Sequence, residues 1–158
     1  MLFILEFFAL DRLDKEILRL LQQDATMAVS EIADRIGLTT TPCWRRIQNL
    51  EQQGVIKQRV ALLDANKLNL GLIVFVQVKA AKHDSNWLTA FAEHAGKIEQ
   101  IVEFYRMSGE YDYLLKVMVA DMQAFDVFYK KLVSGIDLSD VTSSFAMEQI
   151  KYTTALPV

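Results

Sequence analysis

The stretch over residues 29–56 most constrains the fold of this chain, because it encodes two short helices joined by a tight turn. The first helix is expected over residues 30–36, with Ser30 at its N-cap and Gly37 at its end. The second is expected to begin at Thr41-Pro42, since the first turn of a helix leaves its N–H groups unpaired and proline lacks one. It is expected to end at Gly54. Two short helices in this order are typical of a helix-turn-helix.

The second helix has one apolar and one polar face. Cys43, Ile47 and Leu50 form an apolar stripe at spacings of four and three residues. The opposite face is rich in groups that can pair with base edges in a major groove: Thr41, Arg45, Gln48 and Gln52, with Arg46 and Asn49 alongside. Taken alone, this helix favours an ordinary helical hairpin with a solvated face. The turn that Ala33 and Gly37 specify before it favours a helix-turn-helix that binds DNA.

Positive charge is concentrated around the second helix, although the formal net charge of the chain is −3. Residues 42–59 carry four basic side chains against Glu51 alone: Arg45, Arg46, Lys57 and Arg59. A nucleic-acid face is therefore expected here, with Lys57 and Arg59 on phosphates. So small a basic patch would bind DNA weakly as one copy, which favours two copies side by side.

Several function classes are disfavoured by composition. Cys43 is the single cysteine, which excludes an internal disulfide and a cysteine-based zinc site, and His83 and His94 lack metal-ligand spacing. No metal and no cofactor are therefore expected. Residues 1–9 are apolar but too short to span a bilayer and lack the basic start of an export signal, so they are treated as an N-terminal extension. A cytoplasmic protein without membrane association is expected.

The sequence divides into a small helical domain and a larger mixed one. A helix over residues 11–23 is expected to support the two that follow, and residues 55–63 are expected to form a strand after them. The DNA-binding domain is therefore placed at residues 10–63. Turn-forming residues mark a hinge at 64–72, ahead of a second domain at 73–158.

The second domain is expected to be a ferredoxin-like βαββαβ unit, which makes the fold class α+β. Its apolar patterns predict strands at 73–79, 98–107, 113–119 and 141–151 and helices at 87–95 and 122–133. Both helices would cover one face of a four-stranded sheet.

The other face of that sheet is also expected to be apolar. In the third strand Tyr113 and Leu115 point to one face while Leu114 and Met118 point to the other. In the second strand Val102 and Phe104 are expected to oppose Ile101 and Tyr105. Since one chain cannot cover both faces, we expect the bare face to pack on a second subunit.

The loop between the second and third strands is a candidate ligand site. Gly109 lets a small molecule approach the backbone, and Asp112 could accept a hydrogen bond from a ligand ammonium group. Free backbone N–H groups there would hold a carboxylate, so the complement is an amino acid. The alternative is a hairpin whose aspartate satisfies its own turn. The predicted effector set comprises Gly109, Glu110, Tyr111, Asp112 and Tyr113 with the hydroxyls of Thr142, Ser143 and Ser144.

The motifs together resemble the Lrp/AsnC (feast/famine) regulators, over essentially the whole chain after Ala9. The residues that carry the resemblance are Thr41-Pro42-Cys43, Arg45-Arg46, residues 60–64, Gly109-x-x-Asp112-Tyr113-Leu114, residues 143–146 and residues 150–154. The resemblance implies a winged or extended helix-turn-helix and an effector domain that dimerises through its sheets. It also implies a homodimer that assembles further, often to an octamer around which DNA wraps, and a small amino acid bound between effector domains.

The resemblance also implies which residues act. It places DNA contacts at Thr40, Thr41, Arg45, Arg46 and Gln48, and effector contacts at Gly109, Glu110, Tyr111 and Asp112. With Trp44, Asn49, Lys57 and Arg59 added, the DNA-binding set is complete. Residues 39–44 and 109–113 are similar to a narrower branch, the DecR-type regulators linked to cysteine detoxification, which suggests cysteine as effector.

The sequence therefore predicts a transcriptional regulator whose partners are double-stranded DNA and a small amino acid. An architectural protein that wraps DNA without responding to metabolites is the alternative. An enzyme is not expected, because no acid, base and nucleophile converge and an enzyme would leave the N-terminal module unexplained.

Overall fold

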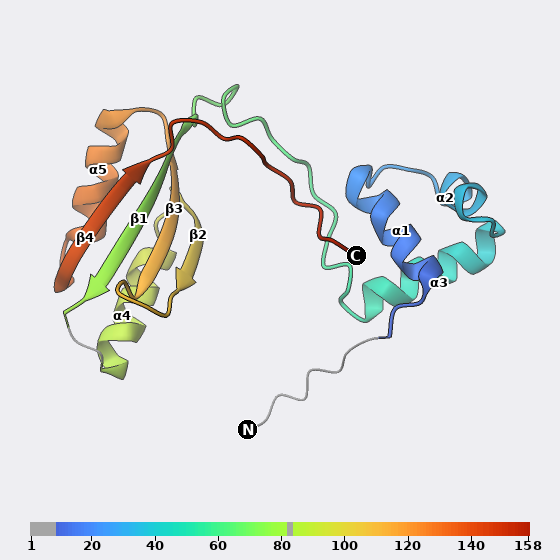
Figure 1. Cartoon of the computed structure of the whole chain (residues 1–158), viewed down its shortest axis with the longest axis horizontal. Coiled ribbons are helices and arrows are strands. Elements are labelled where there is room, and N and C mark those ends of the chain that lie inside the picture. Colours follow the sequence, from blue (N-terminus) through green and yellow to red (C-terminus); the bar gives the residue numbers. More distant parts are fainter. Residues whose placement is uncertain (1–8, 82–83) are drawn as a thin grey trace. The chain divides into compact units, whose positions relative to one another are not determined.

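The computed structural model describes residues 9–81 and 84–158, which form two compact units (Figure 1). The head unit comprises the chain up to Leu62 together with Lys151–Val158, and the sheet unit is Leu63–Ile150. The predicted second domain ran to residue 158, so the structure differs there. The predictions for residues 1–8 and His83 lie outside the described residues. In the described part of the chain, no helix is both long and apolar enough to cross a membrane.

Three helices build the head unit around one apolar core. They are α1 (Arg12–Gln23), α2 (Val29–Ile36) and α3 (Thr40–Gln52). α1 begins one residue after its predicted start at Asp11, whose side chain caps the helix by accepting from the N–H of Asp14. The apolar stripes of the three helices meet in a core that includes Ile17, Leu18, Leu21, Ile32, Ala33, Cys43, Ile47 and Leu50. Each helix is too short to be stable alone, so this shared core holds all three.

The turn between α2 and α3 is set by Gly37, which adopts a left-handed conformation with φ 72°. The N–H of Leu38 donates to the Ala33 carbonyl at 2.9 Å and closes the end of α2. The predicted helix starts were displaced by one or two residues. The N-cap position of α2 is Ala28, with Ser30 inside the helix, and that of α3 is Thr39 rather than Thr41; neither side chain makes a capping hydrogen bond.

The strand predicted at residues 55–63 was wrong. Val55 and Ile56 are half-buried against the head core, but the chain from Lys57 to Asp64 is exposed and irregular. A strand needs a neighbour to satisfy its backbone N–H and C=O groups, and no described residues pair with this segment. The alternation of apolar and polar side chains in the sequence does not show whether such a neighbouring strand exists.

The end of the chain returns to α1 of the head unit. The Gln22 side chain donates to the Leu156 carbonyl at 3.1 Å and accepts from its N–H, while Arg19 Nε donates to the Val158 carbonyl at 2.9 Å. Val158 also packs against the head core. These contacts explain why Lys151–Val158 belong to the head unit.

The sheet unit has the predicted βαββαβ order, which confirms the fold class. Its strands are β1 (Leu72–Ala80), β2 (Ile101–Arg106), β3 (Tyr113–Val119) and β4 (Leu138–Phe145). They pair antiparallel in the order β2-β3-β1-β4. The helices α4 (Ser85–Gly96) and α5 (Met122–Val133) both lie on one face (Figure 1). β4 begins and ends earlier than the predicted strand at 141–151.

The helix-covered face holds the core of the sheet unit. Phe91 of α4 stacks on Trp87 with ring centroids 5.2 Å apart and lies 4.9 Å from the ring of Tyr113 in β3. Phe125, Phe128 and Leu132 of α5 cover the same strands. Tyr113, predicted as an effector contact, is 5 % exposed and packs in this core.

A register shift in β2 changes which side chains share a face. Ile101 is opposite Val117 and Phe104 is opposite Leu115, so both lie on the helix-covered face, although the sequence pattern set them on opposite faces. The irregularity falls between Ile101 and Glu103 and shifts the alternation by one residue. Tyr105 remains on the other face, as predicted.

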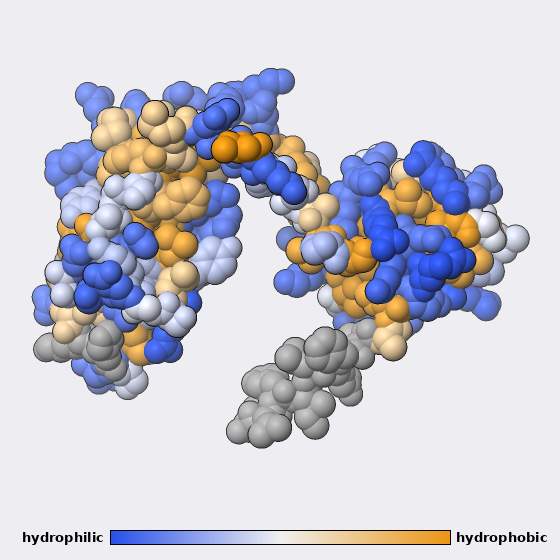
Figure 2. Space-filling view, in the orientation of Figure 1, coloured by the Kyte–Doolittle hydropathy of each residue, from blue (hydrophilic) through white to orange (hydrophobic). Residues whose placement is uncertain are grey.

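The face without helices, here called the bare face, is apolar at one end and polar at the other. Ile73 and Met118 are opposite each other at the apolar end, and Phe75 beside them is 39 % exposed. Gln77, opposite Thr142, begins the polar end. Figure 2 shows apolar colour gathered over the upper part of this unit and blue side chains below.

Candidate nucleic-acid interface and effector site

The exposed side of α3 presents the residues predicted to read DNA. Thr40, Thr41 and Arg45 are exposed, and Trp44 is 51 % exposed although it is a large aromatic residue. Among the described residues, Arg45 has no hydrogen-bond or ion-pair partner. Its guanidinium is therefore available to an external ligand, and an arginine on an exposed helix face suits a bidentate contact with guanine.

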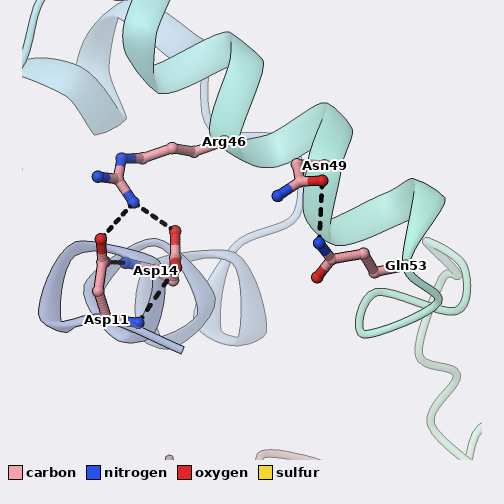
Figure 3. A network of polar contacts seen from close by, with 5 residues as sticks. All are labelled: Asp11, Asp14, Arg46, Asn49 and Gln53. Carbon is pink, nitrogen blue, oxygen red and sulfur yellow. Dashed lines mark hydrogen bonds and ion pairs between the residues drawn. The ribbon is translucent and has the colours of Figure 1, made fainter. Parts of the chain in front are cut away.

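Arg46, the next residue, is differently placed. Its Nη1 lies 2.7 Å from Asp11 Oδ2 and 2.7 Å from Asp14 Oδ1, so it bridges two carboxylates at the N-terminus of α1 (Figure 3). These carboxylates raise the pKa of Arg46 above its usual range. The pKa of Asp11 is lowered, first by the N–H of Asp14 and then by Arg46. The predicted DNA contact at Arg46 is thus engaged within the head unit.

Three further predicted DNA contacts also have partners in the head unit. Arg59 donates to Glu51 and to the Ala25 carbonyl, both at 3.1 Å. Gln48 donates to Glu51 at 3.1 Å, and Asn49 accepts from Gln53 at 3.0 Å. Of the four basic residues in the predicted patch, Arg45 and Lys57 have no such partner within the described chain. The charge presented to a ligand is thus smaller than the sequence count of +3.

The loop before β3 is shaped by Gly109 and closed by Asp112. Gly109 has φ 133°, which other residues rarely adopt. Asp112 Oδ2 accepts from the N–H of Ala80 at 2.8 Å, and the Asp112 N–H donates to the Val78 carbonyl at 3.0 Å. The aspartate therefore ties the loop to the end of β1, and this side-chain bond goes to that strand rather than to its own turn.

Tyr111 connects the loop to β4 on the polar end of the bare face. Its hydroxyl lies 3.1 Å from Asp140 Oδ2 and 3.0 Å from Thr142 Oγ1. Thr142 and Ser144 lie opposite Gln77 and Phe75 and share the bare face, whereas Ser143 lies opposite Val76 on the covered face. The structure thus brings Tyr111 and Thr142 together and separates Ser143 from them.

Asp140 is a polar partner that the sequence did not indicate. Local spacing gave no signal for it, because Tyr111 and Asp140 are 29 positions apart. Asp140 also lines a hollow between α5 and β4, together with residues that include Tyr129, Val133 and Ile136. Glu110 is exposed on the loop. Asp140 thus takes part in the contact with Tyr111 and also lines this hollow.

A second polar group on the bare face was also missed. Lys116 Nζ lies 2.7 Å from Glu103 Oε1, and the Tyr105 hydroxyl donates to Glu103 Oε2 at 2.6 Å. Lys116 and then Tyr105 lower the pKa of Glu103. The Lys116 side chain is only 15 % exposed. Within the described ranges, no group of three or more potential metal ligands is present.

Comparison with known proteins matches both units. The model of the Lrp/AsnC ligand binding domain matches residues 73–156, and a winged helix-turn-helix DNA-binding model matches residues 10–57. The DNA-binding transcriptional activator DecR of Escherichia coli is 51% identical, over 94% of this chain and 99% of its own length. The glutamate uptake regulatory protein of Zymomonas mobilis is 47% identical, over 94% and 91%.

A solved structure gives the same result for the fold. A transcriptional regulator from Neisseria meningitidis, in complex with L-Met, aligns with a TM-score of 0.89. It is 36% identical, and the alignment covers 94% of this chain and 96% of that one. Helix-turn-helix and βαββαβ units are therefore shared in the same order.

Proposed function

Because this chain belongs to the Lrp/AsnC family of DNA-binding transcriptional regulators, we propose that α3 recognises a specific DNA sequence, with Arg45 as its principal base contact. Thr40, Thr41 and Trp44 flank Arg45, and Lys57 holds a phosphate. The observation that best supports this role is that Arg45 is exposed on α3 and has no hydrogen-bond or ion-pair partner among the described residues.

The test compares Arg45→Ala with a matched loss of charge elsewhere. Lys130→Ala removes an exposed cation from α5, where its only described partner is Asp126 on the same helix. The probe is a duplex selected by the wild-type protein from a randomised library. Arg45→Ala should cost about 1–3 kcal/mol and relax the preference at one base pair. Intact affinity and intact preference would exclude α3 as the reader.

We also propose that a small amino acid binds the sheet unit and changes DNA affinity or assembly. Support comes from the match to a ligand-binding domain and from the neighbour in complex with L-Met. The relative named for glutamate uptake makes glutamate a second candidate beside cysteine. The proposed contacts are the Gly109–Asp112 backbone, the Asp112 carboxylate, Glu110, Tyr111 and Thr142.

A test of the effector site must spare the hydrogen bond that Asp112 makes to Ala80. Asp112→Asn keeps an oxygen acceptor for that N–H and removes the negative charge, whereas alanine would remove both. In calorimetric titrations with L-cysteine, L-glutamate and L-methionine, Asp112→Asn and Tyr111→Phe should weaken whichever ligand the wild type binds. Unchanged affinity in both variants would place the site elsewhere.

The bare face supports a further part of the proposal, that two copies pair through their sheets. Phe75, Ile73 and Met118 present apolar surface that two helices of the same chain leave uncovered. Burying this face between two copies would give a homodimer, and dimers would assemble further, to an octamer. Two heads in one assembly would offset the small charge of each.

A further inference from the structure

Arg46 sits at the junction of two helices whose relative position decides what α3 presents. Each neighbouring carboxylate divides its oxygens in the same way. Asp11 Oδ1 accepts from the N–H of Asp14 at 2.8 Å, while Asp11 Oδ2 accepts from Arg46. Asp14 Oδ2 accepts from the N–H of Asp11 at 3.2 Å, while Asp14 Oδ1 accepts from Arg46. All four oxygens are therefore used, and Arg46 completes the cap of α1 from another helix (Figure 3).

The contact joins parts of the chain that are far apart in sequence. Arg46 lies 35 positions from Asp11 and 32 from Asp14. Elsewhere α1 meets α3 through the apolar core, which holds one stripe of α3 but not its flank. A pair of charge-assisted hydrogen bonds on that flank opposes rotation of α3 about its own axis.

We propose that Arg46 is a positioning residue for DNA recognition: it acts on DNA through Asp11 and Asp14 of α1 and does not itself contact the duplex. This rests on the proposed use of α3 as the reading helix. The charge of Arg46 neutralises two carboxylates. The two contacts to Asp11 and Asp14 hold α3 in place and so fix the direction in which Arg45 points.

Removal of Arg46 has two consequences for DNA binding. The flank of α3 loses its connection to α1, and two carboxylates remain unneutralised beside the helix that meets the phosphates. Like charges repel within a Debye length of about 8 Å at physiological salt. The loss of DNA affinity should therefore depend on whether residues 11 and 14 are acidic.

A cycle of four proteins tests this dependence: the wild type, Arg46→Gln, the pair Asp11→Asn/Asp14→Asn, and all three changes together. Asparagine is a good N-cap residue, so α1 keeps its cap. Affinity for the selected duplex is measured over a series of salt concentrations. Circular dichroism establishes that each variant is folded, and Arg45→Gln in both backgrounds serves as the control.

Arg46→Gln should weaken DNA binding about tenfold in the wild-type background and less than about twofold in the double-asparagine background. The salt dependence should stay unchanged in the second comparison. If Arg46 contacted a phosphate, the pattern would be the opposite. Arg46→Gln would then lower DNA affinity equally or more once the aspartates are gone, and would reduce the slope of log K against log salt by about 0.9. That pattern would overturn the proposal.

The control separates this inference from the proposed function. Arg45→Gln should weaken binding in the wild-type background, and by less in the double-asparagine background, where the contact that orients Arg45 is lost. If Arg45→Gln has no effect in either, α3 is not the reader. If Arg45→Gln weakens binding while Arg46→Gln shows no dependence on residues 11 and 14, only the positioning role fails. If Arg46→Gln alone does not fold, the two proteins of the double-asparagine background, with and without Arg46→Gln, still show whether Arg46 contacts a phosphate.

Discussion

At the scale of single residues, two adjacent arginines in α3 have different environments. Arg45 is exposed and has no partner among the described residues, while Arg46 is held by Asp11 and Asp14. Their sequence position cannot separate these roles, because both fit the polar side of one helix. The separation depends on α1, which brings two acids from more than 30 positions away.

Gly109 gives a prediction for the effector loop. Its φ of 133° is strained for any residue with a Cβ, although no heavy atom lies within 4 Å of where that Cβ would be. Gly109→Ala should therefore destabilise the sheet unit by about 1–3 kcal/mol through backbone strain alone. The measurement is urea unfolding followed by far-UV circular dichroism.

Gly96 supplies the matched control for that measurement. It lies at the end of α4 without a positive φ and also has open space around it. Gly96→Ala should be neutral or stabilise by up to about 1 kcal/mol. Equal effects at both positions would show that the loop tolerates a side chain and that its glycine is not conformationally required.

At the scale of elements, the N-terminus of α1 predicts how the head unit responds to acid. The N–H of Asp14 and then Arg46 lower the pKa of Asp11 below its usual value of 3.8. A carboxylate with a depressed pKa in the folded state stabilises above its unfolded pKa and loses that contribution as the pH falls through the folded value.

The stability of the head unit should therefore fall between about pH 5 and pH 2, and Asp11→Asn should make that fall shallower. Thermal unfolding monitored at a series of pH values measures both. An identical pH dependence in the wild type and in Asp11→Asn would contradict the role assigned to this carboxylate. At neutral pH the variant keeps a capping side chain but loses its charged bond to Arg46.

The elements also show what the sequence could and could not predict. α5 was predicted at its observed bounds, because an amphipathic pattern of period 3.6 follows Asp121, which caps it. The predicted strand at 55–63 failed because the pattern of a strand does not report whether a partner exists. The prediction of which side chains share a face of β2 failed for a related reason. Strict alternation assumes an unbroken ladder of hydrogen bonds, and the register of β2 shifts between Ile101 and Glu103.

The candidate sites divide in the same way. The exposure of Arg45 follows from helix periodicity and was predicted, and the composition of the loop correctly marked Gly109 as a special backbone position. The engagement of Arg46 and Arg59, the core position of Tyr113 and the contact of Tyr111 with Asp140 arise from long-range packing. No local pattern encodes those partners.

At the scale of the whole molecule, the bare face predicts self-association. Phe75→Glu places a carboxylate on that face and should weaken pairing, since the charge would have to leave water when the two sheets meet. Sedimentation velocity measures the change in assembly. The wild type should sediment as a dimer or larger species.

Val127 provides a control for the Phe75 substitution. It is 69 % exposed on α5 and therefore more accessible than Phe75 at 39 %. Val127→Glu should leave assembly unchanged, because it lies on the other side of the sheet unit. If both variants assemble as the wild type does, the bare face is not the subunit interface.

We propose that this one chain combines DNA recognition in the head unit with amino-acid sensing in the sheet unit. The most direct test measures affinity for the selected duplex with and without L-cysteine, L-glutamate, L-methionine or L-leucine. At least one of these amino acids should change DNA affinity by about 5-fold to 150-fold, the usual range of coupling between two sites. If none of the four amino acids changes DNA affinity or assembly while tight DNA binding is retained, amino-acid sensing is contradicted. That result would favour an architectural DNA-wrapping protein.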